Sequence, residues 1–292
     1  MGRVFGVEMQ PGWMASHAAY PVPLLLPDGR LRVLFNARDD LNRGHGAWID
    51  LDPANPLRIL GVCDRPSLEP GVVGAFDDRG VSFGSTLMLG DELLLYYMGW
   101  NKSADVPFRN AIGGAVSRDW GTSFERRFTG PLVDRSRFDP FTISYPFVER
   151  GINGQPWRMI YGTSRAGGTR EDDMLHALTE AHSVDGIDWT PTGRDVVPLD
   201  DGEYGLSRPW IANDTMFFSI RRRQYTIGAA RRSSNGTWRR ISGDVLGAGD
   251  GWDGQATCYP AVISVADHHY LFYCGNGYGQ TGFGVALIED MA

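Results

Sequence analysis

Residues 145–164 read YPFVERGINGQPWRMIYGTS, and this stretch decides the fold because its pattern occurs five times in the chain. An aromatic residue followed by Pro opens an apolar strand, a turn comes next, and a second apolar strand follows. A third strand, rich in Ala and read as MLHALTEA at 174–181, continues the unit. Short apolar runs separated by turn residues are typical of β-strands.

The five openings of this repeat pair an aromatic residue or Arg with Pro or Gly. They are Tyr20-Pro21, Phe83-Gly84, Tyr145-Pro146, Arg208-Pro209 and Tyr259-Pro260, separated by 63, 62, 63 and 51 residues. Five units of three or four antiparallel strands predict an all-β, single-domain, five-bladed β-propeller. A β-sandwich would not repeat at this period, and no segment has the sustained helical periodicity of an α/β barrel.

The predicted blades span roughly residues 9–65, 74–130, 136–195, 200–243 and 250–292. The last unit stops after its third strand, near Ile288, so residues 3–8 are expected to supply its outer strand and to close the ring. The Asp-Gly and Asn-Gly pairs between strands are favourable hairpin turns, because both turn positions must tolerate positive φ. The Gly-rich segment 275–279 lies between two strands and predicts a tight loop at the rim of the channel.

Composition and charge argue against several classes of function. A net charge of −7 gives no electrostatic reason to expect a nucleic-acid partner. No apolar run approaches the roughly 18 residues of a membrane span, and the first residues lack the pattern of a signal peptide. Cys63, Cys258 and Cys274 have neither the spacing of a metal site nor that of a disulfide framework. We therefore expect a cytoplasmic protein without metal or cofactor, whose oligomeric state stays open.

Carboxylates recur just before the openings, where a propeller brings the first strand of each blade to the central channel. Asp77, Asp139 and Asp253 stand six residues before an opening, and Asp78 and Glu203 stand five residues before one. The first repeat has no acid at these places and carries His17 instead. One mouth of the channel is therefore expected to receive several carboxylates and one imidazole.

Two interpretations of these acids are open. Crowded carboxylates favour glycoside cleavage, in which one carboxyl stays protonated as the acid while another stays ionised as base or nucleophile. Alternatively, an Asp at a recurrent loop position caps a turn with its side-chain oxygen. Glu203 is the acid least easily explained in this way, because Glu is a poor turn-capping residue.

Other residues are expected at the same mouth. Arg208 opens the fourth repeat, and an Arg inside a channel is expected to pair with carboxylates of the protein or of a ligand. Arg38 ends the second strand of the first repeat and is placed to reach the same rim. Tyr145, Tyr259, Trp100 and Trp210 are candidates for stacking on sugar rings, although large rings also fill the interior of propeller blades.

Five segments carry a resemblance to a known superfamily. They are FDDRGV at 76–81, YYMGWN at 96–101, GPL at 130–132, SRP at 207–209 and NGYGQTGFG at 276–284. With them the chain resembles, over nearly its whole length, the five-bladed propellers of glycoside hydrolase families 32, 43, 62, 68 and 130. It looks most like a branch associated with sugar and polysaccharide genes. The resemblance implies an enzyme that cleaves or transfers a glycosidic or sugar-conjugate bond, with one acid on each of three blades.

Carried onto this sequence, the resemblance assigns Asp78 as the base or nucleophile and Glu203 as the protonated general acid. Asp139 is then the neighbouring carboxylate that orients the catalytic pair and sets its pKa. The family places its acids on the first three blades, whereas here the first blade has none. A carbohydrate or sugar conjugate is the expected partner. The residues expected to bind it are His17, Arg38, Asp77, Tyr145, Arg208, Asp253, Gln255 and Tyr259. At Gln255 the branch tends to carry Glu.

Two alternative functions are left open by the sequence. A phosphorylase or glycosyltransferase on the same fold would be favoured by Arg38, Arg208 and His17 converging on one anion. A non-catalytic carbohydrate-binding propeller would have aromatic platforms but no pair of carboxyls at catalytic separation.

Overall fold

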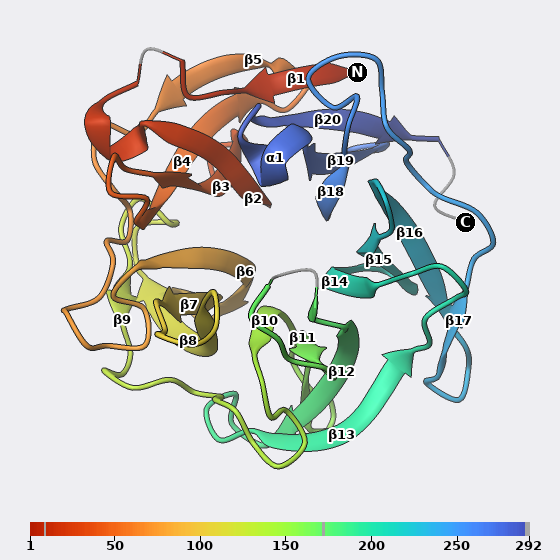
Figure 1. Cartoon of the computed structure of the whole chain (residues 1–292). Coiled ribbons are helices and arrows are strands. Elements are labelled where there is room, and N and C mark those ends of the chain that lie inside the picture. The colour runs from red at the N-terminus through yellow and green to blue at the C-terminus, as the bar shows by residue number, and fades with distance from the viewer. Residues whose placement is uncertain (9, 171–172, 290–292) are drawn as a thin grey trace.

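A computed structural model describes residues 1–8, 10–170 and 173–289, and Figure 1 shows a chain built almost entirely of strands. The two short helical elements are the single turns η1 (Gly12–Met14) and α1 (Asn276–Gly279). Inside α1, Gly277 and Tyr278 have positive φ, so the Gly-rich segment is a tight turn rather than a regular helix. The all-β prediction is confirmed.

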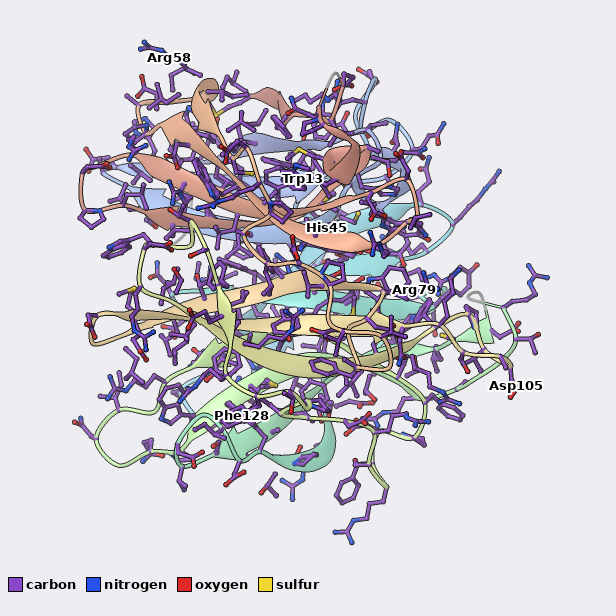
Figure 2. All side chains as sticks on the ribbon, turned by 90° about the vertical axis from the view of Figure 1, so that its left-hand side faces the viewer. Trp13, His45, Arg58, Arg79, Asp105 and Phe128 are labelled. Carbon is purple, nitrogen blue, oxygen red and sulfur yellow. The ribbon has the colours of Figure 1, made fainter. Side chains whose placement is uncertain are left out.

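The first eight-stranded sheet contains two consecutive groups of antiparallel strands. The first group is β2 (Ser16–Leu25), β3 (Leu31–Arg38), β4 (Gly44–Asp52) and β5 (Asn55–Val62). The second group is β6 (Gly80–Leu89), β7 (Glu92–Asn101), β8 (Arg109–Ser117) and β9 (Glu125–Arg126). One parallel pair, Gly44 with Gly80, joins the two groups. In the side view of Figure 2, Arg58 of β5 extends away from the molecule.

The second eight-stranded sheet repeats this arrangement. Its first group is β10 (Ile143–Glu149), β11 (Trp157–Ser164), β12 (His176–Ser183) and β13 (Thr190–Val197). Its second group is β14 (Gly205–Ala212), β15 (Thr215–Arg221), β16 (Tyr225–Arg232) and β17 (Trp238–Arg240). The groups are joined by one parallel pair, His176 with Gly205.

The remaining sheet brings the two ends of the described chain together. It contains β18 (Cys258–Val265), β19 (His268–Cys274), β20 (Phe283–Ile288) and β1 (Gly2–Phe5). β1 pairs antiparallel with β20, with Gly2 opposite Val285. The N-terminal strand is therefore the outer strand of a sheet whose other strands end the chain (Figure 1).

The first strand of each group lies nearest the centre of the molecule (Figure 1). β2 contacts both β6 and β18, β10 contacts both β6 and β14, and β14 contacts β18. Apolar side chains fill the spaces between neighbouring groups. For example, Phe35 of β3 packs on Phe283 of β20 with their ring centroids 5.5 Å apart. Burial of this apolar surface is the main force that holds the groups together.

The openings of the repeats are β-bulges in these first strands. The strand register shifts at each of them. Tyr20, Tyr145, Arg208 and Tyr259 adopt φ values of 57°, 47°, 53° and 59°. This left-handed conformation is unfavourable for bulky residues, and a bulge re-aims the side chain that it contains. The aromatic-Pro signal in the sequence therefore marks the point where each strand bends at the centre.

Gly84 belongs to the one opening that has Gly in place of Pro. A Cβ at this position would collide with the carbonyl oxygens of Pro146 and Tyr96. The backbones of neighbouring groups approach too closely there for any side chain.

We expect Gly84→Ala to lower the free energy of unfolding by about 1–2 kcal/mol, because the added methyl group overpacks this contact. Gly61→Ala is the matched control, since a Cβ there meets no atom within 4 Å. Urea unfolding of both variants measures the difference. Equal midpoints for the two variants would contradict the packing argument.

Candidate functional site

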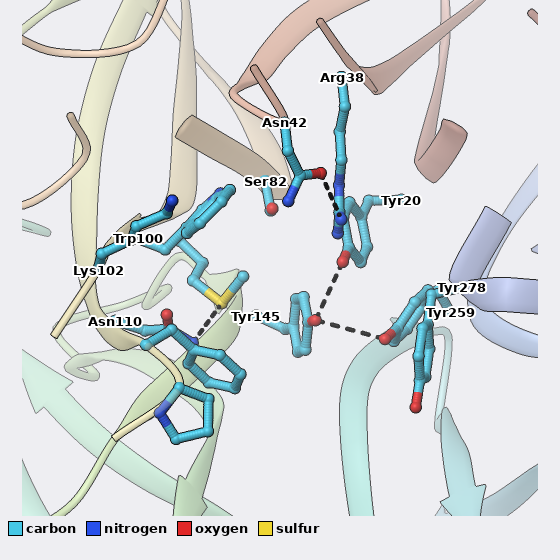
Figure 3. Close-up of a pocket in the computed structure, with 13 residues that line it drawn as sticks. Tyr20, Arg38, Asn42, Ser82, Trp100, Lys102, Asn110, Tyr145, Tyr259 and Tyr278 are labelled. Atoms are coloured by element: carbon cyan, nitrogen blue, oxygen red, sulfur yellow. Dashed lines mark hydrogen bonds between the residues drawn. The ribbon is translucent and has the colours of Figure 1, made fainter. Parts of the chain in front are cut away.

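A pocket of about 360 Å³ opens where the first strands converge (Figure 3). Strand residues and connecting loops both contribute to it. Its lining consists of Tyr20, Arg38, Asn42, Ser82, Met98, Trp100, Lys102, Pro107, Phe108, Asn110, Tyr145, Tyr259 and Tyr278.

Three of the bulged openings supply a cluster that we call the tyrosine triad: Tyr20, Tyr145 and Tyr259. The Tyr145 hydroxyl lies 3.3 Å from that of Tyr20 and 3.4 Å from that of Tyr259 (Figure 3). The ring centroids are 4.7–5.3 Å apart. Burial raises the pKa of Tyr145 and Tyr259 well above the ordinary value, so these hydroxyls stay protonated and can donate hydrogen bonds.

Arg208 comes from the fourth opening and is buried against this triad, with its guanidinium carbon 5.9 Å from the centre of the Tyr20 ring. It donates hydrogen bonds to the carbonyl oxygens of Phe83 and Pro21, the latter at 2.8 Å. Burial lowers the pKa of Arg208 to about 10, which still leaves it charged at neutral pH. The expectation that Arg208 pairs with protein carboxylates is wrong, because the partners it has among the described residues are backbone carbonyls.

Two cations lie at the rim of the pocket. Arg38 is half-buried and donates a hydrogen bond to Asn42 Oδ1 at 3.1 Å, and Lys102 is exposed. Neither has a carboxylate within ion-pair distance among the described residues, and the described lining contains no Asp or Glu. His17 lies near Arg38 but outside the lining. Burial and the charge of Arg38 lower the pKa of His17 to about 4, so its ring is neutral at neutral pH.

The acids aligned before the openings make a repeated contact of their own. In three groups the aspartate accepts a hydrogen bond from a Tyr hydroxyl on the second strand, each at 2.9 Å, and we call these pairs the Asp–Tyr latches. They are Asp77 with Tyr97, Asp139 with Tyr161, and Asp253 with Tyr273. Each latch is a hydrogen bond between the loop that precedes a group's first strand and the second strand of the same group.

The two groups without a latch support this structural role. In the first group Met14 takes the place of the aspartate, and in the fourth group Gly202 does so. By strand register, the positions that correspond to the latch tyrosines are Phe35 and Phe218. Where the carboxylate is absent, the hydroxyl is absent too. The aspartates at this position are therefore explained by a local hydrogen bond.

Glu203 has a different environment. Its buried carboxylate accepts hydrogen bonds from Arg240 at 2.6 and 2.8 Å and from Arg222 at 3.0 Å. Burial alone would raise its pKa, but the two guanidiniums outweigh burial and hold the pKa below its ordinary value of 4.5. The expectation of a protonated Glu203 is wrong, and its partners are these two arginines rather than Arg208.

The other predicted residues lie outside the lining. Asp78 Oδ2 accepts a hydrogen bond from the Gly74 amide at 2.9 Å, while its Oδ1 is buried without a hydrogen-bond partner among the described residues. Gln255 is exposed, and its backbone amide donates to Asn276 Oδ1 at 2.7 Å. Of the residues predicted to bind substrate or to stack on it, the lining unites Arg38, Tyr145, Tyr259 and Trp100. The prediction for Trp210 is wrong, because its ring is buried in the core and its indole nitrogen donates to the Val262 carbonyl oxygen at 2.8 Å.

Sequence reasoning missed several lining residues. Tyr20 carries the same opening signal as Tyr145 and Tyr259 and could have been found with them. Asn42, Lys102 and Tyr278 stand on connections between strands, where the repeat provides no alignment.

Comparisons with known proteins show which sequences and structures this chain resembles. No protein-family model matches the chain. The uncharacterized protein Rv1502 of Mycobacterium tuberculosis is 36% identical over 297 residues, an alignment that covers 99% of this chain and 98% of that protein.

Solved structures are similar at lower sequence identity. One glycoside hydrolase has a TM-score of 0.75 at 17% identity, covering 99% of this chain and 92% of that protein. A glycosyl hydrolase from Bacteroides ovatus has a TM-score of 0.74 at 14% identity, covering 96% and 86%. A structure from work on the GH130 family of mannoside phosphorylases, which contains glycoside hydrolases that target β-1,2 mannosidic linkages in Candida mannan, has a TM-score of 0.70 at 14% identity and covers 96% and 86%.

Two further features are absent from the part of the chain that the structure describes. It contains no helix long and apolar enough to cross a membrane. Within the same residues, His, Cys, Asp and Glu form no group of three or more that could hold a metal ion.

Proposed function

Because this chain belongs to the same family as Rv1502 and has the fold of the propeller-type glycoside hydrolases, we propose that it binds a carbohydrate in the pocket at the tyrosine triad. The composition of the pocket lining carries the proposal. Aromatic faces offer stacking surfaces for sugar rings, and the hydroxyls and amides between them can orient sugar hydroxyls. The volume of about 360 Å³ lies within the range of pockets that bury small ligands.

We also propose that the chain forms five blades around this pocket. The closed series of contacts from β2 through β6, β10, β14 and β18 back to β2 supports that number. β1 would then be the outer strand of the fifth blade. Residues from several blades would thereby meet at one central site.

Cleavage or transfer of a glycosidic bond by paired carboxylates is the second candidate function. The fold of glycoside-active enzymes favours it, and so does Asp78 Oδ1, which is buried without a hydrogen-bond partner among the described residues. In this scheme Asp78 would have to supply the acid, because Asp139 accepts a hydrogen bond from Tyr161 and its Oδ1 lies 3.9 Å from Arg165. Two arginines hold Glu203 ionised, so its carboxylate suits the role of a base or of an ion-pair partner that holds these arginines in place.

We expect Trp100→Ala to weaken carbohydrate binding about 30-fold, because the pocket loses a large stacking surface. Trp238→Ala, which removes an equal ring on β17 outside the pocket lining, should leave affinity unchanged.

The experiment is a screen of oligosaccharides by isothermal titration calorimetry, with product analysis of the same mixtures to detect bond cleavage. Binding that survives Trp100→Ala unchanged would place the ligand elsewhere. Turnover lost in Asp78→Asn but retained in Trp238→Ala would favour the catalytic candidate over a pure binding function.

A further inference from the structure

We propose that the sugar bound in this pocket carries an anionic group, a carboxylate or a phosphate ester, and that Arg38 and Lys102 bind it. This inference rests on the proposed function, because it names the class of carbohydrate for the same site.

The first observation is the balance of charge around the pocket. The chain has a net charge of −7, yet the described lining contains two cations and no carboxylate. The acids nearest in sequence are Asp39 and Asp40 beside Arg38 and Asp105 beside Lys102. Asp39 accepts hydrogen bonds from Arg43 and His45, and none of the three forms an ion pair with Arg38 or Lys102 among the described residues.

The second observation is the incomplete bonding of Arg38. Arg38 is a half-buried residue whose guanidinium lies at an exposed position, and among the described residues it has one hydrogen bond, to the neutral amide of Asn42. Other arginines of the fold have carboxylate partners, such as Arg32 with Asp50 and Arg43 with Asp39. A guanidinium has five donors in a planar fork that matches a carboxylate or phosphate group. Most of the donors of Arg38 have no partner in the part of the chain that the structure describes, so they can bind a ligand at the edge of the pocket.

A third positive charge lies behind the triad. Arg208 is fully buried, and its hydrogen bonds go to neutral carbonyl oxygens, so no described carboxylate cancels its charge. In a site of low dielectric, this charge adds to the attraction that Arg38 and Lys102 exert on an anion.

The size of the pocket favours an anion attached to a sugar over a free anion. Inorganic phosphate would occupy only a small part of about 360 Å³ and would leave the aromatic faces uncovered. A sugar ring that bears the charge can cover these faces and reach the cations at once.

The test compares charged sugars with their neutral parents. The probes are galacturonate with galactose, glucuronate with glucose, mannuronate with mannose, mannose 6-phosphate with mannose, and inorganic phosphate alone. In at least one pair we expect the charged member to bind tenfold or more tightly than the neutral one, and this preference should shrink as salt is raised. The uronate and phosphate-ester arms distinguish the two sources of charge.

Arg38→Gln and Lys102→Gln should each weaken binding of the charged sugar about 10- to 100-fold and should weaken binding of its neutral parent far less. Arg58→Gln is the control: it removes the same charge from an exposed side chain on β5, outside the lining.

Each result separates the two proposals. Equal binding of charged and neutral sugars, lost in Trp100→Ala, would overturn the anionic preference and leave the carbohydrate site standing. Binding of inorganic phosphate as tight as that of mannose 6-phosphate, without binding of any uronate, would also overturn it. If no carbohydrate binds, the proposed function itself fails.

Discussion

Replacement of Glu203 by Gln is expected to lower the free energy of unfolding by about 3 kcal/mol at neutral pH. The Glu203 carboxylate is fully buried and joins Arg240 and Arg222, so an amide in its place leaves two guanidiniums facing a neutral group. Most of the loss should come from Arg240, because its side chain is 14% exposed against 37% for Arg222. Each arginine keeps one other carboxylate, the exposed Asp200 for Arg240 and Asp244 for Arg222. Glu125→Gln, at a side chain that is 83% exposed, is the control and should change little.

The effect should depend on pH in one direction. The pKa of Glu203 in the folded protein lies below its ordinary value of 4.5. The stabilisation is therefore complete above pH 4.5 and is lost as the pH falls through the lower, folded-state value. Urea unfolding of both proteins at a series of pH values from 7 to 3 measures this. A difference that stays constant to pH 3 would show that the charge of Glu203 is not the source of the stability.

Removal of one Asp–Tyr latch by Tyr161→Phe is expected to cost about 2–3 kcal/mol of unfolding free energy. Asp139 is completely buried, and it would lose the Tyr161 hydroxyl that donates to it at 2.9 Å. Tyr204→Phe, at an exposed ring, is the matched control. Chemical denaturation followed by tryptophan fluorescence measures the effect.

A double-mutant cycle with Asp139→Ala, which removes the acceptor altogether, tests whether the two residues act as a unit. We expect the effects of the two substitutions to be far from additive, because either one breaks the same contact. Additive effects would mean that Asp139 and Tyr161 stabilise the fold independently. They would return Asp139 to the candidates for a purely catalytic role.

The fold was largely predictable because its determinants are local. Apolar strands, turn residues and the aromatic-Pro openings repeat along the chain, and each can be identified without knowing its neighbours in space. The openings even mark the bulges at Tyr20, Tyr145 and Tyr259 that form the triad.

The chemistry of the site was less predictable because it depends on where side chains point. Alignment placed Asp139 correctly at the entrance to a group, but the direction of its carboxylate is set by Tyr161, 22 residues later. The arginines that hold Glu203 ionised follow it by 19 and 37 residues. Such pairings depend on which residues of neighbouring strands lie opposite each other. The distance of an acid from its opening in the sequence gives no information about that register.

The pairing of β1 with β20 has a consequence for biosynthesis. Residues 2–5 leave the ribosome well before their partner strand, Phe283–Ile288, which is made some 280 residues later. At translation rates of about 5–20 residues per second, the N-terminal strand waits roughly 15–60 seconds for its partner. During this time its backbone donors and acceptors are open to pairing with other nascent chains. Until β20 has been made, the last sheet stays incomplete and every new copy of the protein passes through an aggregation-prone stage.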